Sequence, residues 1–149
     1  MVDFSAEMQR VCLPFLNEQE TRVLLNGMVS ISVQSGGGLY SLDDPADCLY
    51  LIVSGRIAVR KKTGFGDRMQ VVALLDPGAP VGEGGLLPGH LRGATLTAVA
   101  DSRLLALSRQ SFDELSAADP ALALKLVKWL MGRVSLRLRE NSERLAHVL

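Results

Sequence analysis

Between residues 28 and 107 the chain is divided into short apolar runs, and this pattern restricts the fold more than any other feature of the sequence. The runs are rich in β-branched and aliphatic residues and read VSISV, CLYLIV, RIAVR, MQVVALL, ATLTAVA and RLLALS. The segments between them, such as QSGGG, DDPAD and DPGAP, contain the Gly, Pro and Asp residues that favour turns. Many short strands at this spacing are typical of an antiparallel sandwich or barrel.

A helical pattern precedes the β region and predicts helix over about residues 3–27. Within this segment, Asn17 and Glu20 have the spacing of a capping box, and Gly27 suits the C-terminal end of a helix. The first strand is therefore expected directly after a capped helix.

Two further helices are expected after the β region. The segment SRQSFDELSAADP predicts a short helix that begins near Ser108 or Ser111, and Pro120 opens a long helix that continues nearly to the chain end. Apolar residues on the long helix recur in alternating steps of three and four, with Asn141 in one gap, which is the heptad pattern of a coiled coil. This seam consists of Leu124, Val127, Met131, Val134, Leu138, Leu145 and Val148. We expect a homodimer through this helix; the alternative is that the seam packs on the chain's own β region.

The length fits a single domain, 1–149, in which residues 1–27 are helical, residues 28–108 form a β-barrel and residues 109–149 are again helical. Hydrophobic residues make up 48% of the chain, yet the longest aliphatic run lies within 49–55 and is far shorter than the roughly 20 residues of a membrane helix. The N-terminus has no apolar segment of secretory type. We therefore expect a cytoplasmic protein with no membrane contact.

The charges balance, with 16 basic and 16 acidic residues, so nothing attracts the chain generally to nucleic acid. Residues 121–149 are more basic than the rest, which we interpret as a solvated helix face, and no helix-turn-helix follows them. Binding to nucleic acid is therefore not expected. Cys12 and Cys48 have neither metal nor redox spacing and are expected to be small buried apolar residues.

The segment VGEGGLLPGHLRGATLTA, residues 81–98, combines five glycines with one acid, Glu83, and one arginine, Arg92. A glycine-rich turn that leads into a short helical turn can direct several backbone amides at an anion, and the planar guanidinium of Arg92 suits phosphate. A carboxylate such as Glu83 suits a hydroxyl instead, for example the 2′-hydroxyl of a ribose. A nucleotide pocket and an internal Glu83–Arg92 salt bridge both fit these residues.

The same segment resembles the phosphate-binding cassette of cyclic nucleotide-binding domains. That cassette has an apolar residue, Gly, Glu, an apolar stretch, and then Arg, a small residue, Ala and a hydroxyl-bearing residue. The matching residues are Val81, Gly82, Glu83, Leu86, Arg92, Gly93, Ala94 and Thr95. The resemblance extends to LDDPADCLYLIVSGRIAV before the cassette and LLALSRQSFDELSAADPAL after it, and it covers about residues 16–134.

The resemblance implies a mainly β fold with flanking helices: an eight-stranded antiparallel jelly-roll β-barrel, an N-terminal helix and a long C-terminal helix. It also implies that Glu83 accepts a hydrogen bond from the ribose and that Arg92 pairs with the cyclic phosphate. Backbone amides of the cassette complete the phosphate site. The residues predicted to bind the ligand are Gly82, Glu83, Gly84, Gly85, Arg92, Gly93, Ala94 and Thr95.

In this family the C-terminal helix closes over the base of the nucleotide. A gapless alignment places the base-contacting turn near Arg137 and Leu138, and a slip of one turn would place Asn141 and Ser142 there instead. Members that prefer cGMP often have Thr at the position of Gly93, so the resemblance favours cAMP over cGMP. No cofactor is implied beyond this ligand.

Two positions depart from the family pattern. Cassettes usually have a larger apolar residue at the position of Gly84, and Gly85 makes the segment still more flexible, which the sequence does not explain. Asp43 replaces a common glycine, and we expect this change to affect a loop rather than the pocket.

The predicted function is that of a regulatory sensor, in which cyclic-nucleotide binding moves the C-terminal helix and an effector protein responds. One alternative is a structural dimerisation module with a vestigial pocket. Another is a metal enzyme of the cupin type, which shares the jelly roll. Such an enzyme needs several converging ligands, and the chain has only His90 and His147, so we do not expect catalysis.

Overall fold

The computed structural model describes residues 13–62, 64 and 68–148. Among these residues the helices are α2 (Glu18–Asn26), α3 (Arg109–Ala118), α4 (Pro120–Val148) and the short 3-10 helix η1 (Glu83–Leu86). The strands are β1 (Met28–Val33), β2 (Gly38–Tyr40), β3 (Cys48–Ser54), β4 (Ile57–Lys62), β5 (Met69–Leu75), β6 (Pro80–Val81), β7 (Thr95–Ala98) and β8 (Ser102–Ser108).

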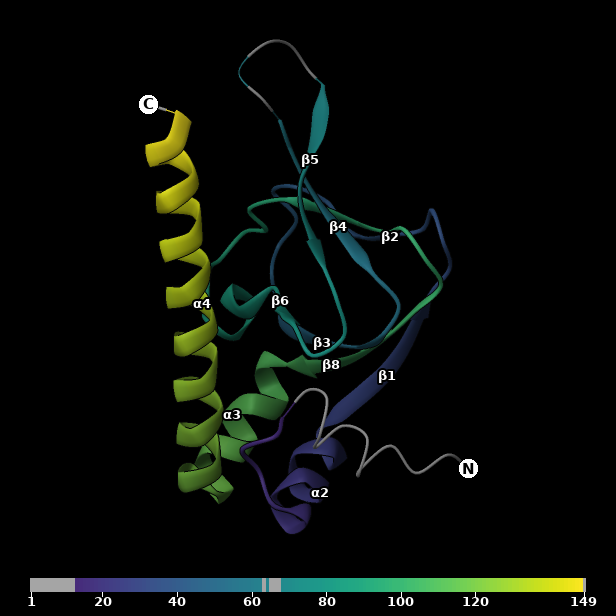
Figure 1. Ribbon diagram of the computed structural model, residues 1–149. Coiled ribbons are helices and arrows are strands. Elements are labelled where there is room, and N and C mark those ends of the chain that lie inside the picture. Colours follow the sequence, from purple (N-terminus) through teal and green to yellow (C-terminus); the bar gives the residue numbers. More distant parts are fainter. Residues whose placement is uncertain (1–12, 63, 65–67, 149) are drawn as a thin grey trace.

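Within the described residues, the strands form two four-stranded antiparallel sheets, with the orders β1-β8-β3-β6 and β2-β7-β4-β5. α4 runs along one side of the β region, with α3 at its N-terminal end (Figure 1). The predicted class, mainly β with flanking helices and eight antiparallel strands, is confirmed. The two strands that the apolar runs did not show, β2 and β6, have only three and two residues, too few for a repeating pattern.

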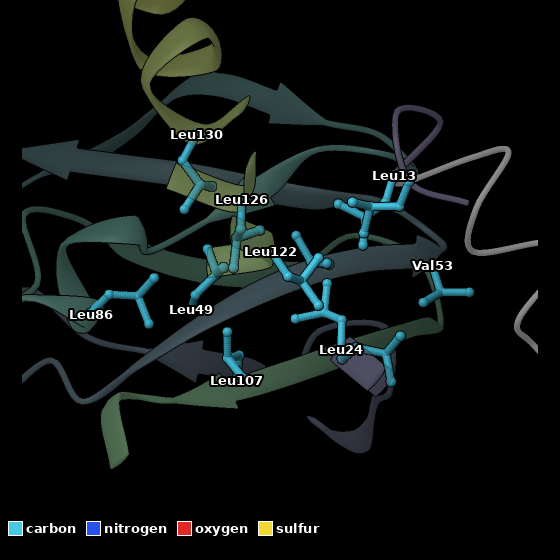
Figure 2. Close-up of a cluster of buried hydrophobic side chains, with 12 residues drawn as sticks. Leu13, Leu24, Leu49, Val53, Leu86, Leu107, Leu122, Leu126 and Leu130 are labelled. Carbon is cyan, nitrogen blue, oxygen red and sulfur yellow. The ribbon is translucent and has the colours of Figure 1, made fainter. Parts of the chain in front are cut away.

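Strand β3 of the first sheet packs against apolar clusters on both of its faces. Along β3, Leu49, Leu51 and Val53 belong to a cluster shared with the helices, whereas Ile52 belongs to a second cluster that fills the space between the sheets. Figure 2 shows the first cluster, in which leucines of α4 lie over this sheet. A strand covered on both faces reads as a continuous apolar run, as CLYLIV does.

α2 is shorter than the helix predicted from the sequence. Asn17 and Glu20 form the expected capping box, but Asn17 has the extended backbone of a capping residue, with φ −78° and ψ 175°. The helix therefore begins at Glu18, and residues 13–16 before it are not helical. The rest of the predicted helix, residues 3–12 with Cys12, lies outside the described residues.

The first half of α4 is fixed to the remainder of the domain. Its buried residues are Leu122, Ala123, Leu126 and Leu130. Lys125 pairs with Glu20 of α2 at 2.7 Å, and this hydrogen bond, followed by that from the Asn17 amide, lowers the pKa of Glu20. Among the described residues, no helix has the length and apolar character that would allow it to span a membrane.

The heptad seam and the buried residues of α4 are different sets of residues. All seven apolar seam residues are exposed. The buried contact of α4 with the domain is made by residues 122, 123, 126 and 130. Five seam residues, Val127, Met131, Val134, Leu145 and Val148, line a cavity between α4 and the β region. The homodimer and the alternative of packing on the β region therefore both stay predictions. An apolar stripe of this length on the surface has no occupant among the described residues.

Candidate ligand-binding site

A cavity of about 1160 Å³ lies between the predicted cassette, the β4–β5 hairpin and α4. The cassette contributes η1 and the loop that follows it, and α4 contributes residues from Val127 to Val148. Glu83, Arg92, Arg137 and Asn141 all line this cavity. The structure thus brings together residues of the cassette and the C-terminal helix that lie about fifty positions apart in the sequence.

Arg92 lies in the cavity wall with only 4% of its surface exposed. Its Nη1 donates to the carbonyl oxygen of Gly82 at 3.0 Å, and its Nη2 donates to that of Cys48 at 2.9 Å. The guanidinium also lies over the rings of Tyr40 and Tyr50, at 4.2 and 5.5 Å from their centroids. Arg92 therefore connects the cassette to β2 and β3.

Gly82 is required by this arrangement for two reasons. Its φ of +71° lies in the left-handed region, which residues with a Cβ rarely adopt. A Cβ at this position would also lie 2.3 Å from Nη1 of Arg92. The cassette can therefore pass this close to the arginine only with glycine at residue 82.

The doubled glycine that the sequence does not explain has a structural cause at Gly85. A Cβ on Gly85 would lie 2.2 Å from the carbonyl oxygen and 2.6 Å from the nitrogen of Cys48, so η1 packs directly on the backbone of β3. A Cβ on Gly84 would lie 3.2 Å from the ring of His90, an exposed side chain that can move. Close packing therefore requires glycine at residue 85 and tolerates change at residue 84.

The amide of Gly85 is not directed at a ligand. It donates to the carbonyl oxygen of Gly82 at 2.9 Å inside the 3-10 turn. The carbonyl of Gly85 accepts from Nε of Arg109, the first residue of α3, and Arg109 also donates to the carbonyl of Ala46. Gly85 therefore joins the cassette to α3 rather than presenting a free donor.

The loop at Asp43 is closer to the site than the sequence indicates. Asp43 has φ +68°, in the left-handed region where a glycine would be unstrained. Its amide donates to the carbonyl of Arg92 at 2.9 Å, and the amide of Arg92 donates to the carbonyl of Asp44 at 2.8 Å. This loop therefore holds the backbone of Arg92 through main-chain hydrogen bonds. The expectation that the change at residue 43 affects a loop rather than the pocket stays a prediction.

Glu83 pairs with α4 and not with Arg92. Its carboxylate lies 3.5 Å from Nη1 of Arg137, and Nη2 of the same arginine donates to the carbonyl of Pro80. The alternative of an internal Glu83–Arg92 salt bridge is therefore wrong. Arg137 instead connects the second half of α4 to the cassette.

Some of the remaining predicted site residues line the cavity and others do not. Gly93, Ala94 and Asn141 line the cavity. Thr95 does not, and its hydroxyl accepts from the amide of Leu42 at 2.9 Å. Leu138 is 67% exposed and lies outside the cavity lining.

Tyr40, Tyr50 and Arg109 were missed by the sequence analysis. They belong to β2, β3 and α3, and nothing in the local sequence relates them to the cassette. Among the residues that the structure describes, no group of three His, Cys, Asp or Glu side chains could hold a metal ion.

Comparison with known proteins agrees with this geometry. Residues 30–119 match the sequence model of the cyclic nucleotide-binding domain. The chain belongs to this family. The match includes the whole cassette, both sheets except the first residues of β1, and α3. The matched family is a ligand-binding regulatory domain.

Two curated relatives of this cyclic nucleotide-binding domain are proteins named for cAMP. The cAMP-dependent protein kinase regulatory subunit of Dictyostelium discoideum is 31% identical over 105 residues, which cover 69% of this chain and 32% of the relative. The cyclic AMP receptor protein of Thermus thermophilus is 34% identical over 99 residues, covering 66% and 45%. The domain thus spans less than half the length of each.

The fold is also found in a solved structure. The crystal structure of a cyclic nucleotide-binding domain from Methylobacillus flagellatus superimposes with a TM-score of 0.86 at 26% identity, covering 98% of this chain and 82% of the other. The family resemblance is therefore confirmed over residues 30–119, and the predicted fold is confirmed by the superposition.

Proposed function

We propose that this domain is a regulatory module that binds a 3′,5′-cyclic nucleotide, cAMP in preference to cGMP, in the cavity between the cassette and α4. The observation that carries the proposal is Arg92, a buried guanidinium in the cavity wall that no carboxylate neutralises within the described residues. The cyclic phosphate supplies the missing negative charge. The domain itself catalyses no reaction and lies in the cytoplasm.

Each part of the nucleotide has a partner in this cavity. Arg92 binds the phosphate, and Glu83, on the neighbouring cassette turn, accepts a hydrogen bond from the ribose hydroxyl. The base extends toward α4, where Asn141 offers both a donor and an acceptor. The names of the two curated relatives and the lack of a hydroxyl at Gly93 support cAMP.

A melting experiment tests this function. We expect cAMP at about 100 times its dissociation constant to raise the free energy of unfolding by roughly 2.7 kcal/mol, with a smaller gain from the same concentration of cGMP. The melting temperature is measured by differential scanning fluorimetry, with 5′-AMP as a control that carries an uncyclised phosphate. If neither cyclic nucleotide changes the melting temperature at millimolar concentration, the domain is a structural module with a vestigial pocket.

The contact between Arg137 and Glu83 connects ligand binding to α4. In the structure, Arg137 is bound to the carboxylate that the ribose hydroxyl requires. The second half of α4 has no buried residue of its own, so this arginine is its principal connection to the cassette. We propose that the ribose displaces Arg137 from Glu83, which releases the second half of α4 and lets an effector protein detect the ligand.

Replacing Arg137 with alanine is expected to release this half of α4 without ligand. Because one ion pair and one hydrogen bond are lost, amide exchange of residues 131–148 should become roughly 3- to 10-fold faster, as measured by hydrogen–deuterium exchange. Arg139→Ala is the matched control, since the ion pair of Arg139 among the described residues is with Glu143 on the same helix. Equal exchange in the wild type and Arg137→Ala would contradict the coupling.

We further propose a homodimer through the seam of α4. The seam residues are exposed, they follow heptad spacing, and the single polar position, Asn141, can fix the register of two helices. Several seam residues, among them Val127 and Val134, also line the cavity, so a second copy would lie next to the bound ligand.

Leu138→Glu is expected to separate the dimer, because it places a carboxylate on the apolar seam of each helix. The dimer dissociation constant should rise by on the order of 100-fold, as measured by sedimentation equilibrium. Leu138 lies outside the cavity lining, so the variant leaves the ligand site intact. Leu136→Glu changes an exposed leucine away from the seam and should remain dimeric; a wild type that is monomeric at micromolar concentration would refute the dimer.

A further inference from the structure

The charge of Arg92 is stabilised in an unusual way. A buried cation is costly unless a partner compensates it, and the usual partner is a carboxylate. Arg92 is only 4% exposed, yet among the residues that the structure describes no carboxylate pairs with it. Other groups must therefore offset the loss of water around its guanidinium.

Besides the Sγ of Cys48, which accepts from Nη2 at 3.5 Å, four neutral groups surround the guanidinium. Two are the carbonyl oxygens of Gly82 and Cys48, which accept hydrogen bonds from its two terminal nitrogens. The other two are the rings of Tyr40 and Tyr50, within the distance at which a cation is attracted to an aromatic face. Tyr40 ends β2 of the second sheet and Tyr50 lies in β3 of the first, so the rings fix Arg92 relative to both sheets.

The two rings form one surface, with centroids 6.1 Å apart and planes inclined by 29°. Burial raises the pKa of Tyr40 to about 12, against the opposing effect of Arg92, and burial also raises the pKa of Tyr50. Both phenols therefore stay protonated at neutral pH. The rings attract the cation through their electron-rich faces and add no negative charge.

We propose that Tyr40 and Tyr50 are positioning residues that hold the guanidinium of Arg92 at the phosphate subsite while leaving its charge available to the ligand. This inference rests on the proposed binding of a cyclic nucleotide. A carboxylate in the place of the rings would also hold Arg92, but it would compete with the phosphate for the same donors. The aromatic surface offsets part of the cost of burial without that competition.

Removing the nearer ring tests the proposal. In Tyr40→Leu the affinity for cAMP, measured by isothermal titration calorimetry, should fall roughly 10-fold, because Arg92 loses its closest aromatic contact. Tyr40→Phe keeps the ring and removes only the hydroxyl, so its affinity should stay within about threefold of the wild type. Tyr50→Leu should have a smaller effect than Tyr40→Leu, since its ring lies 1.3 Å farther from the guanidinium (5.5 against 4.2 Å).

A control separates positioning from general stability. Val33→Ala removes apolar packing from the same cluster between the sheets, at a residue outside the cavity lining. The melting temperature of the free protein is measured for Val33→Ala and Tyr40→Leu. If Val33→Ala lowers cAMP affinity as much as Tyr40→Leu for a comparable loss of melting temperature, the proposal is overturned. It is also overturned if Tyr40→Leu binds within threefold of the wild type, or if Tyr40→Phe loses as much as Tyr40→Leu.

A spectroscopic measurement on the ligand-free protein keeps the test independent of function. The Nε–H signal of Arg92 in a ¹⁵N spectrum, assigned by its absence in Arg92→Lys, should be displaced by the ring currents of the two tyrosines. It should move toward the position of an exposed arginine in Tyr40→Leu and stay in place in Tyr40→Phe. If the Nε–H signal of Arg92 has the same position in Tyr40→Leu as in the wild type, the proposal is overturned. A wild type that shows the displaced signal but binds neither cAMP nor cGMP refutes the proposed function instead.

Discussion

Arg92→Leu is expected to abolish the thermal shift that cAMP produces. The substitution removes the cationic partner of the phosphate, and the loss of such a buried, hydrogen-bonded charge weakens binding by roughly 100-fold or more. It also leaves the carbonyls of Gly82 and Cys48 without their donors. The free energy of unfolding should therefore fall by about 2 kcal/mol or more even without ligand, as measured by urea denaturation.

Two further variants separate loss of binding from loss of folding. Arg92→Lys keeps the positive charge, but a lysine ammonium lacks the planar guanidinium whose two terminal nitrogens donate to the carbonyls of Gly82 and Cys48. We therefore expect a cAMP affinity and a stability between those of the wild type and Arg92→Leu. Glu83→Ala removes only the acceptor for the ribose hydroxyl and should weaken binding less than Arg92→Leu, with the fold intact. A folded Arg92→Leu protein that still responds to cAMP would show that the phosphate binds elsewhere.

The second large effect is expected at Gly85. The added methyl of Gly85→Ala would meet three backbone atoms of Cys48, its oxygen at 2.2 Å, nitrogen at 2.6 Å and carbonyl carbon at 2.7 Å. The added methyl belongs to the backbone of η1 and the atoms it meets belong to the backbone of β3. Neither can rotate aside as a flexible side chain does, so η1 must move away from β3. We expect a loss of roughly 3 kcal/mol in unfolding free energy, together with weaker cAMP binding because the cassette is displaced.

Gly93→Ala is the matched control for stability. No atom of the described residues lies within 4 Å of a Cβ at Gly93, and the φ of Gly93 is not in the left-handed region. The free energy of unfolding of Gly93→Ala should therefore differ from that of the wild type by less than about 0.5 kcal/mol. The fluorescence of Trp129, the single tryptophan, reports unfolding for both variants. Equal stability of Gly85→Ala and Gly93→Ala would contradict the close packing of η1 on β3.

Much of the fold was predictable because the relevant signals are local. The turn residues between apolar runs predicted six of the strands, and Ser108 caps α3 as expected, accepting from the amide of Ser111. α4 begins at Pro120 as predicted. β2 and β6 were not visible, since such short strands exist only because β7 and β3 offer them backbone partners.

The cassette was predictable for the same reason, since its residues are close in sequence. The order of Gly82, Glu83 and Arg92 within one short segment indicated an anion site beside an acceptor, and the family match agrees. The requirement for glycine at residue 85 was not predictable. It depends on the backbone of Cys48, which approaches from a strand more than thirty residues earlier.

By itself, the sequence indicated which groups we propose to bind a phosphate and a ribose, because these groups follow one another along the chain. Only the tertiary structure decided which partners they have without ligand. Glu83 and Arg92 could have neutralised each other, but the fold places Arg137 on Glu83 and two tyrosine rings on Arg92. These contacts join four separate elements, and pairing between distant elements is set by how the sheets and α4 pack rather than by any local pattern.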